Sequence, residues 1–276
     1  MSLRDKAEVL RSLHVPGRPL VLANVWDAGS AVVTARAGAP ALATTSAGLA
    51  WSLGAADGDR IDRDVALAAV ARIAASVDVP VSADVERGFG ADATGVAETV
   101  RGVLDAGAVG INLEDSTSDR SAPLRPVAEA AGRVAAARAA ADERGVPLYV
   151  NARTDVFLGR IGEPETRLAA TLERAAAYLA AGASGVFVPG VTDLETVTAL
   201  AKAIGAPLNV LAGPGAPTVA ELAAAGVARV SLGSSVTLAA YALAERATRE
   251  LLETGTYEAV AGRADYGGLN SLFARS

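Results

Sequence analysis

The 276-residue sequence contains no cysteine and a single histidine, His14. Without cysteine the chain has no disulfide, no thiolate nucleophile and no cysteine-ligated zinc or iron–sulfur centre. One histidine cannot build a histidine-rich metal site, and it disfavours Ser–His–Asp catalysis. Any bound metal should therefore be a hard cation held by oxygen atoms, with Mg²⁺ the first choice and Mn²⁺ the second.

Aromatic residues and positive charge are also scarce. Phe, Trp and Tyr make up 4% of the chain, and 25 Lys+Arg against 31 Asp+Glu give a net charge of −6. This composition disfavours a nucleic-acid partner, which needs basic surfaces and stacking platforms. The longest stretches without charge, 175–192 and 203–220, contain glycine and proline and predict no membrane-spanning helix. The charged N-terminus lacks the apolar core of a signal peptide, so we expect a cytoplasmic protein.

Short apolar runs alternate with long alanine-rich stretches of helical period. The runs are continuous, which is typical of parallel strands covered on both faces. The predicted strands are Leu20–Asn24, Ala41–Ser46, Val79–Asp84, Val109–Glu114, Leu148–Ala152, Gly185–Val188, Leu208–Leu211 and Ala228–Leu232. The predicted helices are 28–37, 62–77, 93–106, 126–144, 163–181, 193–203, 217–225 and 234–253.

Eight strand–helix units in a chain of this length predict a (β/α)8 TIM barrel. We expect residues 1–276 to form one barrel domain, with 254–276 as a C-terminal helical extension. The alternative is an open doubly wound sheet, which is disfavoured because no Gly-x-Gly-x-x-Gly motif follows the first strand.

Polar residues collect where predicted strands two to five end, the edge at which such barrels carry their reacting groups. Residues two apart on a strand share a face, which groups Asp84 with Glu86, Asn112 with Glu114, and Asn151 with Arg153 and Asp155. Clustered carboxylates repel one another unless a cation lies between them, and the Arg153 guanidinium suits a substrate carboxylate. The pattern predicts a metal-dependent site for a small dianionic or 2-oxo acid. The alternatives are structural: Asp57, Asp115 or Asp155 as caps, and Arg153 as an ion-pair partner.

At these residues the sequence resembles the isocitrate lyase/phosphoenolpyruvate mutase superfamily, from about Pro19 to Gly233. Five segments carry the resemblance in one colinear order: Asn24–Ala31, Leu53–Asp57, Asp84–Gly90, Leu113–Asp115 and Asn151–Asp155. The resemblance implies a barrel whose eighth helix is exchanged between subunits of a homodimer, or of a homotetramer of two such dimers. It also implies an enzyme that makes or breaks C–C or P–C bonds beside a 2-oxo acid through a Mg²⁺-stabilised enolate.

The resemblance further assigns roles to individual residues. Asp84 is the implied direct Mg²⁺ ligand, and Asp57, Glu86 and Glu114 are implied to hold metal-bound water. Arg153 and the backbone N–H groups of a Ser46-Ala47-Gly48 turn are implied to bind the substrate carboxylate. From their positions, Trp26 is a further candidate for the pocket wall and Asn209 for a pocket contact.

Two departures from the family narrow the activity. Isocitrate and 2-methylisocitrate lyases carry a catalytic cysteine in a Lys-x-Cys-Gly-His-type loop, so a chain without cysteine is expected to have neither activity. The predicted lid, residues 115–125, lacks the lysine of phosphonate-processing relatives, although Arg120 or Arg125 is an alternative source of charge. If the segment is a lid rather than a solvated loop, Thr117 and Ser118 join Asp57, Glu114 and Arg153 as catalytic candidates.

We therefore expect a Mg²⁺-dependent lyase or hydrolase that cleaves a C–C bond of a small, oxaloacetate-like 2-oxo acid. Two alternatives remain open: a P–C bond enzyme (phosphonopyruvate hydrolase or phosphoenolpyruvate mutase), and a non-catalytic 2-oxo acid binder. The glycine-containing segments 213–215 and 233–235 are interpreted as turns and helix caps.

Overall fold

A computed structural model describes residues 1–274 of the chain and contains one eight-stranded sheet. All eight expected strands are confirmed, with ends that differ by a few residues. Their bounds are β1 Leu20–Leu22, β2 Leu42–Ala43, β3 Val81–Asp84, β4 Gly110–Glu114, β5 Tyr149–Arg153, β6 Gly185–Val188, β7 Leu208–Leu211 and β8 Arg229–Ser231.

The strands are parallel and follow the order β1-β8-β7-β6-β5-β4-β3-β2. Between β1 and β2 the ladder is reduced to one bridge, Val25 to Thr44. The Val25 N–H donates to the Ala43 carbonyl at 2.9 Å, and the Thr45 N–H donates to the Val25 carbonyl at 3.0 Å. The sheet is therefore a nearly closed (β/α)8 barrel, as the sequence predicts.

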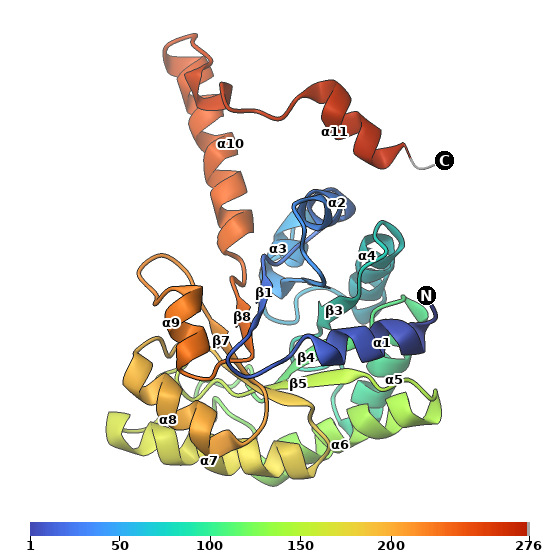
Figure 1. The fold of residues 1–276 in the computed structure, drawn as a ribbon, viewed down its shortest axis with the longest axis vertical. Helices are drawn as coiled ribbons and strands as arrows, with labels where there is room; N and C mark the ends of the chain where they lie inside the picture. The colour runs from blue at the N-terminus through green and yellow to red at the C-terminus, as the bar shows by residue number, and fades with distance from the viewer. Residues whose placement is uncertain (275–276) are drawn as a thin grey trace.

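Helices alternate with the strands and cover most of the barrel (Figure 1). The eight expected helices are present as α2 Ala28–Arg36, α4 Arg63–Ala75, α5 Ala93–Asp105, α6 Val127–Glu143, α7 Pro164–Ala180, α8 Leu194–Ile204, α9 Val219–Ala224 and α10 Ser235–Glu253. The extension beyond Glu253 contains a 3₁₀ turn, Glu258–Val260, and α11, Tyr266–Phe273. Within residues 1–274, no helix is long and apolar enough to cross a membrane.

Two further helices were not expected from the sequence: α1 Leu3–Ser12 and α3 Ser46–Ser52. Helix α1 begins with a capping box between Ser2 and Asp5 and contacts β5. Just after it, His14 stacks on Tyr149 with ring centroids 3.7 Å apart. Burial lowers the pKa of His14 to about 3. The sole histidine is therefore a neutral core residue that packs against the start of β5, away from the strand ends that carry the site.

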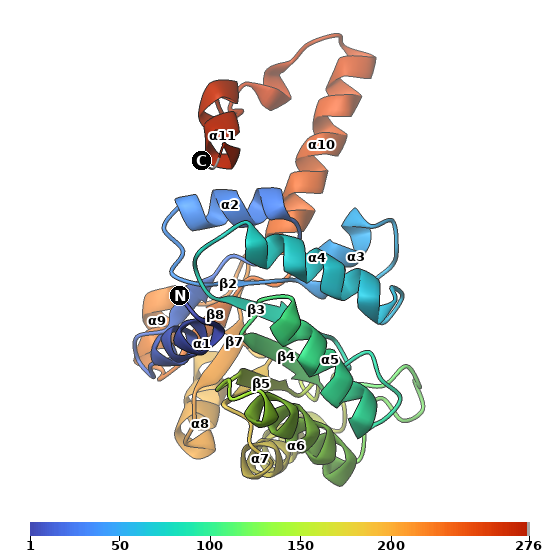
Figure 2. The same ribbon diagram turned by 90° about the vertical axis from the view of Figure 1, so that its right-hand side faces the viewer.

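Helix α10 departs from the barrel instead of packing against it (Figures 1 and 2). Thr237 is its buried residue, whereas Leu238, Tyr241 and Leu251 are exposed. On the barrel, the outward side chain of Val21 in β1 is 44% exposed, although strands of parallel barrels are normally covered by helices. The eighth helix thus leaves apolar surface open both on itself and over β1.

Candidate active site

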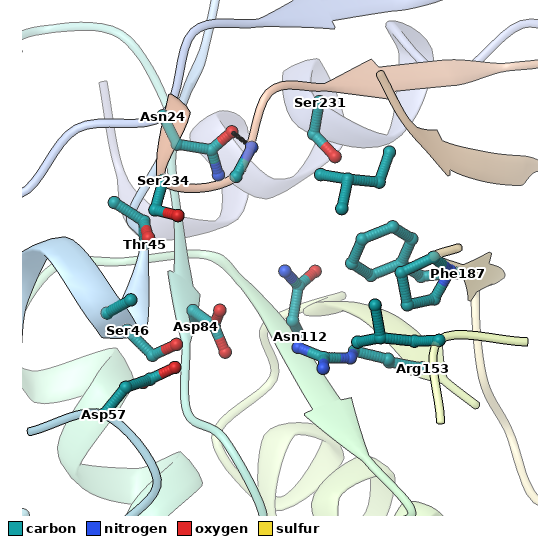
Figure 3. A pocket seen from close by; sticks show the side chains of 15 residues that line it. Asn24, Thr45, Ser46, Asp57, Asp84, Asn112, Arg153, Phe187, Ser231 and Ser234 are labelled. Carbon is teal, nitrogen blue, oxygen red and sulfur yellow. Dashed lines mark hydrogen bonds between the residues drawn. The ribbon is translucent and has the colours of Figure 1, made fainter. Parts of the chain in front are cut away.

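Two adjoining cavities open where the strands end, with volumes of about 130 and 320 Å³. They share Ser46, Asp57 and Arg153. The smaller cavity also contains Asp84 and Asn112 (Figure 3). The larger one adds Glu86, Arg87, Glu114, Ser116, Thr117 and Asp155. The structure therefore brings the carboxylates and the arginine predicted from strand ends two to five into one continuous site.

The acidic residues of β3 and the turn after it lie at the centre of this site, where Asp84 is half-buried and Glu86 is buried. The Asp84 carboxylate accepts the Glu86 N–H at 3.1 Å, and the Glu86 carboxylate accepts the Asp59 N–H. Burial raises the pKa of Asp84 to about 6 and that of Glu86 to about 8, and neighbouring carboxylates add to both shifts. Such shifts mark negative charge that the protein alone does not neutralise.

Arg153, at the end of β5, lies on the opposite side of this group of carboxylates. It forms an ion pair with Glu114 at 2.9 Å and a bidentate pair with Asp155 at 2.6 and 2.8 Å. Burial alone lowers the pKa of Arg153, but these carboxylates outweigh burial and raise it above its ordinary value. A guanidinium has five N–H donors, so two remain for a ligand in the cavity after these three contacts. The structural ion-pair interpretation of Arg153 is thus correct, and it is compatible with substrate binding.

The donor set suits a hard divalent cation. All the acidic groups offer oxygen, and a cation among them relieves the charge that raises the pKa of Asp84 and Glu86. Within residues 1–274, no three acidic or histidine side chains converge closely enough to form a ready-made chelating site. Mg²⁺ does not require such convergence, because it keeps several waters and takes few direct carboxylates.

The raised pKa values predict how stability depends on pH. Because the pKa values of Asp84 and Glu86 are raised by folding, the native protein binds more protons than the unfolded chain. The stability that these protons contribute is complete at pH values below the ordinary carboxyl pKa. It is lost as the pH rises through about 6 for Asp84 and about 8 for Glu86. We expect Mg²⁺ to raise the melting temperature more at about pH 9 than at about pH 5. Equal shifts at both pH values in thermal melts would contradict this prediction.

An unusual loop follows Asp84, and a buried arginine holds it. Glu86 (φ 50°), Gly88 (φ 92°) and Phe89 (φ 48°) all adopt left-handed backbone, which is costly for non-glycine residues. Arg133 of α6 is 2% exposed and donates to the carbonyls of Arg87, Gly90 and Ala91 at 2.6, 2.7 and 3.2 Å. The interaction fixes the loop and, through it, the direction of the Glu86 carboxylate.

Replacing Arg133 with methionine should therefore destabilise the fold. The variant leaves the carbonyls of Arg87, Gly90 and Ala91 without their donor. We expect the free energy of unfolding to fall by about 3 kcal/mol, measured by urea denaturation. The exposed Arg72 of α4 provides the control, since Arg72→Met should change it by less than about 0.5 kcal/mol. Equal effects of the two substitutions would remove the loop-fixing role.

The segment Ser46-Ala47-Gly48 is the first turn of helix α3, not a simple turn as expected. Thr45 caps the helix and accepts the Gly48 N–H at 3.4 Å. Within the described chain, no protein acceptor takes the N–H of Ser46 or Ala47, and both residues line the smaller cavity. A Cβ at Gly48 would lie 2.6 Å from the Thr237 hydroxyl, so glycine is needed there for close packing.

Asn112 lines the smaller cavity. It shares a face of its strand with Glu114, as the sequence predicts, but no role was expected for it. Its Oδ1 accepts Asn151 Nδ2 at 2.8 Å and Arg229 Nη2 at 3.4 Å. Because both contacts use the oxygen, the Asn112 amide nitrogen is left to face the cavity beside Asp84 (Figure 3). Its place in the pocket could be predicted from the sequence, since Asn112 lies two residues before Glu114 on the same strand.

The lid, residues 115–125, is a short hairpin joined by a bridge between Ser116 and Leu124. Thr117 lines the larger cavity, but its hydroxyl donates to the Ala122 carbonyl at 2.6 Å, and Ser118 is exposed. Neither Arg120 nor Arg125 lines either cavity. The positive charge beside the lid comes instead from Arg87, whose guanidinium contacts Ser116 at 3.1 Å and Asp59 at 2.9 Å.

The remaining candidates lie around the cavities. Asn209 is buried in the barrel interior, where it contacts Asn151 and Ser231, and it lines neither cavity. Trp26 is half-buried against the first turn of α3 and also lines neither cavity. Residues that the sequence analysis did not propose as pocket contacts do line the smaller cavity: Asn24, Thr45, Leu158, Phe187, Pro189, Leu211, Ser231, Gly233 and Ser234.

Residues 10–252 match the family model of phosphoenolpyruvate phosphomutase. The chain is 38% identical to the uncharacterised protein Rv1998c of Mycobacterium tuberculosis, over 80% of each chain. It is 31% identical to 2-methylisocitrate lyase of Escherichia coli, over 94% of this chain and 89% of that one. It is 30% identical to oxaloacetate decarboxylase of Bradyrhizobium, over 92% and 88%.

Solved structures agree with these matches. The "putative phosphonomutase" of Burkholderia cenocepacia superposes with a TM-score of 0.84 at 44% identity, covering 92% of this chain and all of that one. A phosphonopyruvate hydrolase in complex with oxalate and Mg²⁺ superposes with a TM-score of 0.85 at 25% identity, covering 99% and 95%. The chain belongs to the phosphoenolpyruvate mutase family, and it is an enzyme of the wider phosphoenolpyruvate mutase/isocitrate lyase superfamily of lyases, hydrolases and mutases.

Proposed function

We propose that this enzyme is a Mg²⁺-dependent lyase that cleaves the C3–C4 bond of an oxaloacetate-like 2-oxo acid through the enolate of pyruvate. The observation that carries the proposal is the position of Arg153. It borders both cavities, with buried carboxylates on one side and the open N-terminus of α3 on the other.

The 2-oxo carboxylate would bind between Arg153 and the N–H groups of Ser46 and Ala47. Two guanidinium N–H groups are not engaged by Glu114 or Asp155, and the two backbone N–H groups have no protein acceptor in the described chain. A helix N-terminus and a guanidinium both favour an anion. This arrangement would fix the 2-oxo group next to Asp84 and Asn112.

The metal would be held directly by Asp84 and through water by Asp57, Glu86 and Glu114. When bound, Mg²⁺ supplies positive charge that stabilises the oxyanion developing on the 2-oxo oxygen. The phosphonopyruvate hydrolase of similar fold, whose complex contains both oxalate and Mg²⁺, supports the choice of metal.

The chain's own groups would complete the reaction. The Asn112 amide nitrogen, held toward the cavity by Asn151 and Arg229, would donate a hydrogen bond to the developing oxyanion. As the C3–C4 bond breaks, its electron pair becomes the C2–C3 double bond of the enolate and CO₂ leaves. C3 then takes a proton from water to give pyruvate.

This step suits the residues present because it needs no strong general base. Among the described residues, neither cavity is lined by histidine or lysine, and the chain has no cysteine. Hydrolytic cleavage would also require a group that deprotonates water, a role for which the cavities, within residues 1–274, offer only carboxylates. The second candidate, a P–C bond enzyme, is supported by the matching family model but not by the lid, which has no lysine.

Product analysis with purified enzyme, Mg²⁺ and oxaloacetate tests the proposal. We expect pyruvate and CO₂, with the rate abolished by a chelator and restored by added Mg²⁺. Oxalate and acetate as products would indicate a hydrolase. Phosphate release from phosphonopyruvate without turnover of oxaloacetate would favour the P–C enzyme. Mg²⁺-dependent oxalate binding without turnover of any 2-oxo diacid would indicate a non-catalytic binder.

We also propose that α10 packs on the barrel of a second copy of this chain. Helix α10 exposes the apolar side chains of Leu238, Tyr241 and Leu251, and the barrel exposes the apolar side chain of Val21. The two surfaces could therefore cover each other in a dimer. Light scattering should then give about two or four times the chain mass of 27.6 kDa. A monomer at micromolar concentration would contradict this arrangement.

A further inference from the structure

One wall of the smaller cavity is apolar and takes no part in the proposed chemistry. It is formed by Leu158 after β5, Phe187 of β6, Pro189 just after β6 and Leu211 of β7. Phe187 lies across the cavity from Asp84 (Figure 3). The acidic residues come from strand ends two to four, so the cavity has a charged side and a hydrocarbon side.

Arg153 lies at the boundary between the two sides. Its guanidinium carbon is 5.9 Å from the centre of the Phe187 ring, while its N–H groups contact Glu114 and Asp155. A substrate carboxylate bound to Arg153 would therefore lie beside the aromatic ring, at the edge of the hydrocarbon wall. The next carbons of the substrate meet hydrocarbon on this wall, with no charged group other than Arg153 at its edge.

Leu158 is fixed at the mouth of the cavity, although it is 45% exposed. Its turn is closed by hydrogen bonds from Gly159 N–H to the Asp155 carbonyl at 2.8 Å and from Ile161 N–H to the Val156 carbonyl at 2.9 Å. The turn also packs directly on Gly190, where a Cβ would lie 2.6 Å from the Leu158 nitrogen. Leu158 therefore presents an aliphatic side chain at a fixed position in the lining of the smaller cavity.

We infer that this wall is a specificity subsite for a short alkyl group on C3 of the 2-oxo acid. The inference rests on the proposed function for the position of the carboxylate and the 2-oxo group. A methyl or ethyl group on C3 loses contact with water against Leu158, Phe187 and Leu211, whereas a charged group there loses hydration without gaining a partner. A cavity of about 130 Å³ limits the group to a few carbons. The preferred substrate class is thus 3-alkyl oxaloacetates.

Binding of unreactive acids tests the subsite independently of turnover. Calorimetry with Mg²⁺ should give affinities that rise from pyruvate to 2-oxobutanoate to 2-oxopentanoate by about fourfold for each buried methylene. The charged analogue 2-oxoglutarate should bind more weakly than 2-oxopentanoate. With turnover as the readout, 3-methyloxaloacetate should have a higher kcat/KM than oxaloacetate by a similar factor.

Serine substitutions test whether the rise in affinity with alkyl chain length depends on this wall. In Leu158→Ser and Leu211→Ser, the ratio of 2-oxopentanoate affinity to pyruvate affinity should fall toward one. Leu194→Ser, on the exposed surface of α8, should retain the wild-type ratio. Equal affinities along the wild-type series, with Mg²⁺-dependent oxalate binding intact, would overturn this inference alone. Absence of oxalate binding to the wild-type enzyme would overturn the proposed function and the inference together.

Discussion

Asp84→Ala should abolish turnover of oxaloacetate and Mg²⁺-dependent oxalate binding. Asp84 is the carboxylate that ends β3, lies in the smaller cavity and faces the space between Asp57 and Asn112. Removing the proposed direct metal ligand takes away the charge that stabilises the enolate, so we expect kcat/KM to fall by at least about a thousandfold. Steady-state kinetics and calorimetry measure the two effects.

The same substitution should leave the fold intact or stabilise it. The Asp84 carboxyl is half-buried and desolvation raises its pKa to about 6, so its charge opposes folding at neutral pH. Loss of activity with an unchanged or higher melting temperature would separate a metal ligand from a structural residue. Asp78 is exposed before the start of β3, and Asp78→Ala should change neither activity nor metal binding. An Asp84→Ala enzyme that retains wild-type turnover would rule out the proposed role.

Arg153→Met should have the largest effect on stability among the site residues. The guanidinium pairs with Glu114 and Asp155, and removing it leaves Asp155 without its cation and Glu114 with only the longer contact to Arg87 at 3.8 Å. Breaking a buried ion pair from one side typically costs about 3–5 kcal/mol, which urea denaturation measures directly. Oxalate binding should be lost as well.

Arg153→Lys separates charge from geometry at this position. Lysine keeps the positive charge between Glu114 and Asp155, so part of the stability should return. It cannot present two parallel N–H groups to a carboxylate, so oxalate affinity should stay at least about a hundredfold below wild type. Full recovery of both stability and affinity in the lysine variant would show that only the charge of Arg153 matters.

The barrel and its acidic centre were predictable because their signals are local. Each buried strand is a continuous apolar run, and Glu114 and Arg153 follow from a two-residue period along strands whose ends meet at one edge. Glu86 lies beyond the end of β3 in left-handed backbone, so the strand period does not determine its direction. Helix α3 was not predictable in this way. Its seven residues, Ser46–Ser52, contain no charge and begin where a turn was expected, and its cap depends on Thr45 in the preceding loop.

Features that depend on tertiary packing could not be predicted from the local sequence. Arg133 lies in an alanine-rich helix, where an arginine is normally a solvated surface residue, and nothing local indicates that it binds three carbonyls of a distant loop. Phe187 and Leu211 belong to ordinary apolar strands, and only the closed barrel turns them toward the same cavity as Asp84.

The two sides of the cavity come from separate, consecutive stretches of the chain. The charged side, with Arg153 and Asp155, is encoded between residues 57 and 155, and the hydrocarbon side between 158 and 211. Under the proposed function, substitutions in the later stretch would therefore change which acid is accepted while the groups proposed to stabilise the enolate stay the same. With the two sides encoded separately, mutation or recombination within the later stretch would alter the substrate range. The residues of the earlier stretch, and with them the catalytic groups, would be retained.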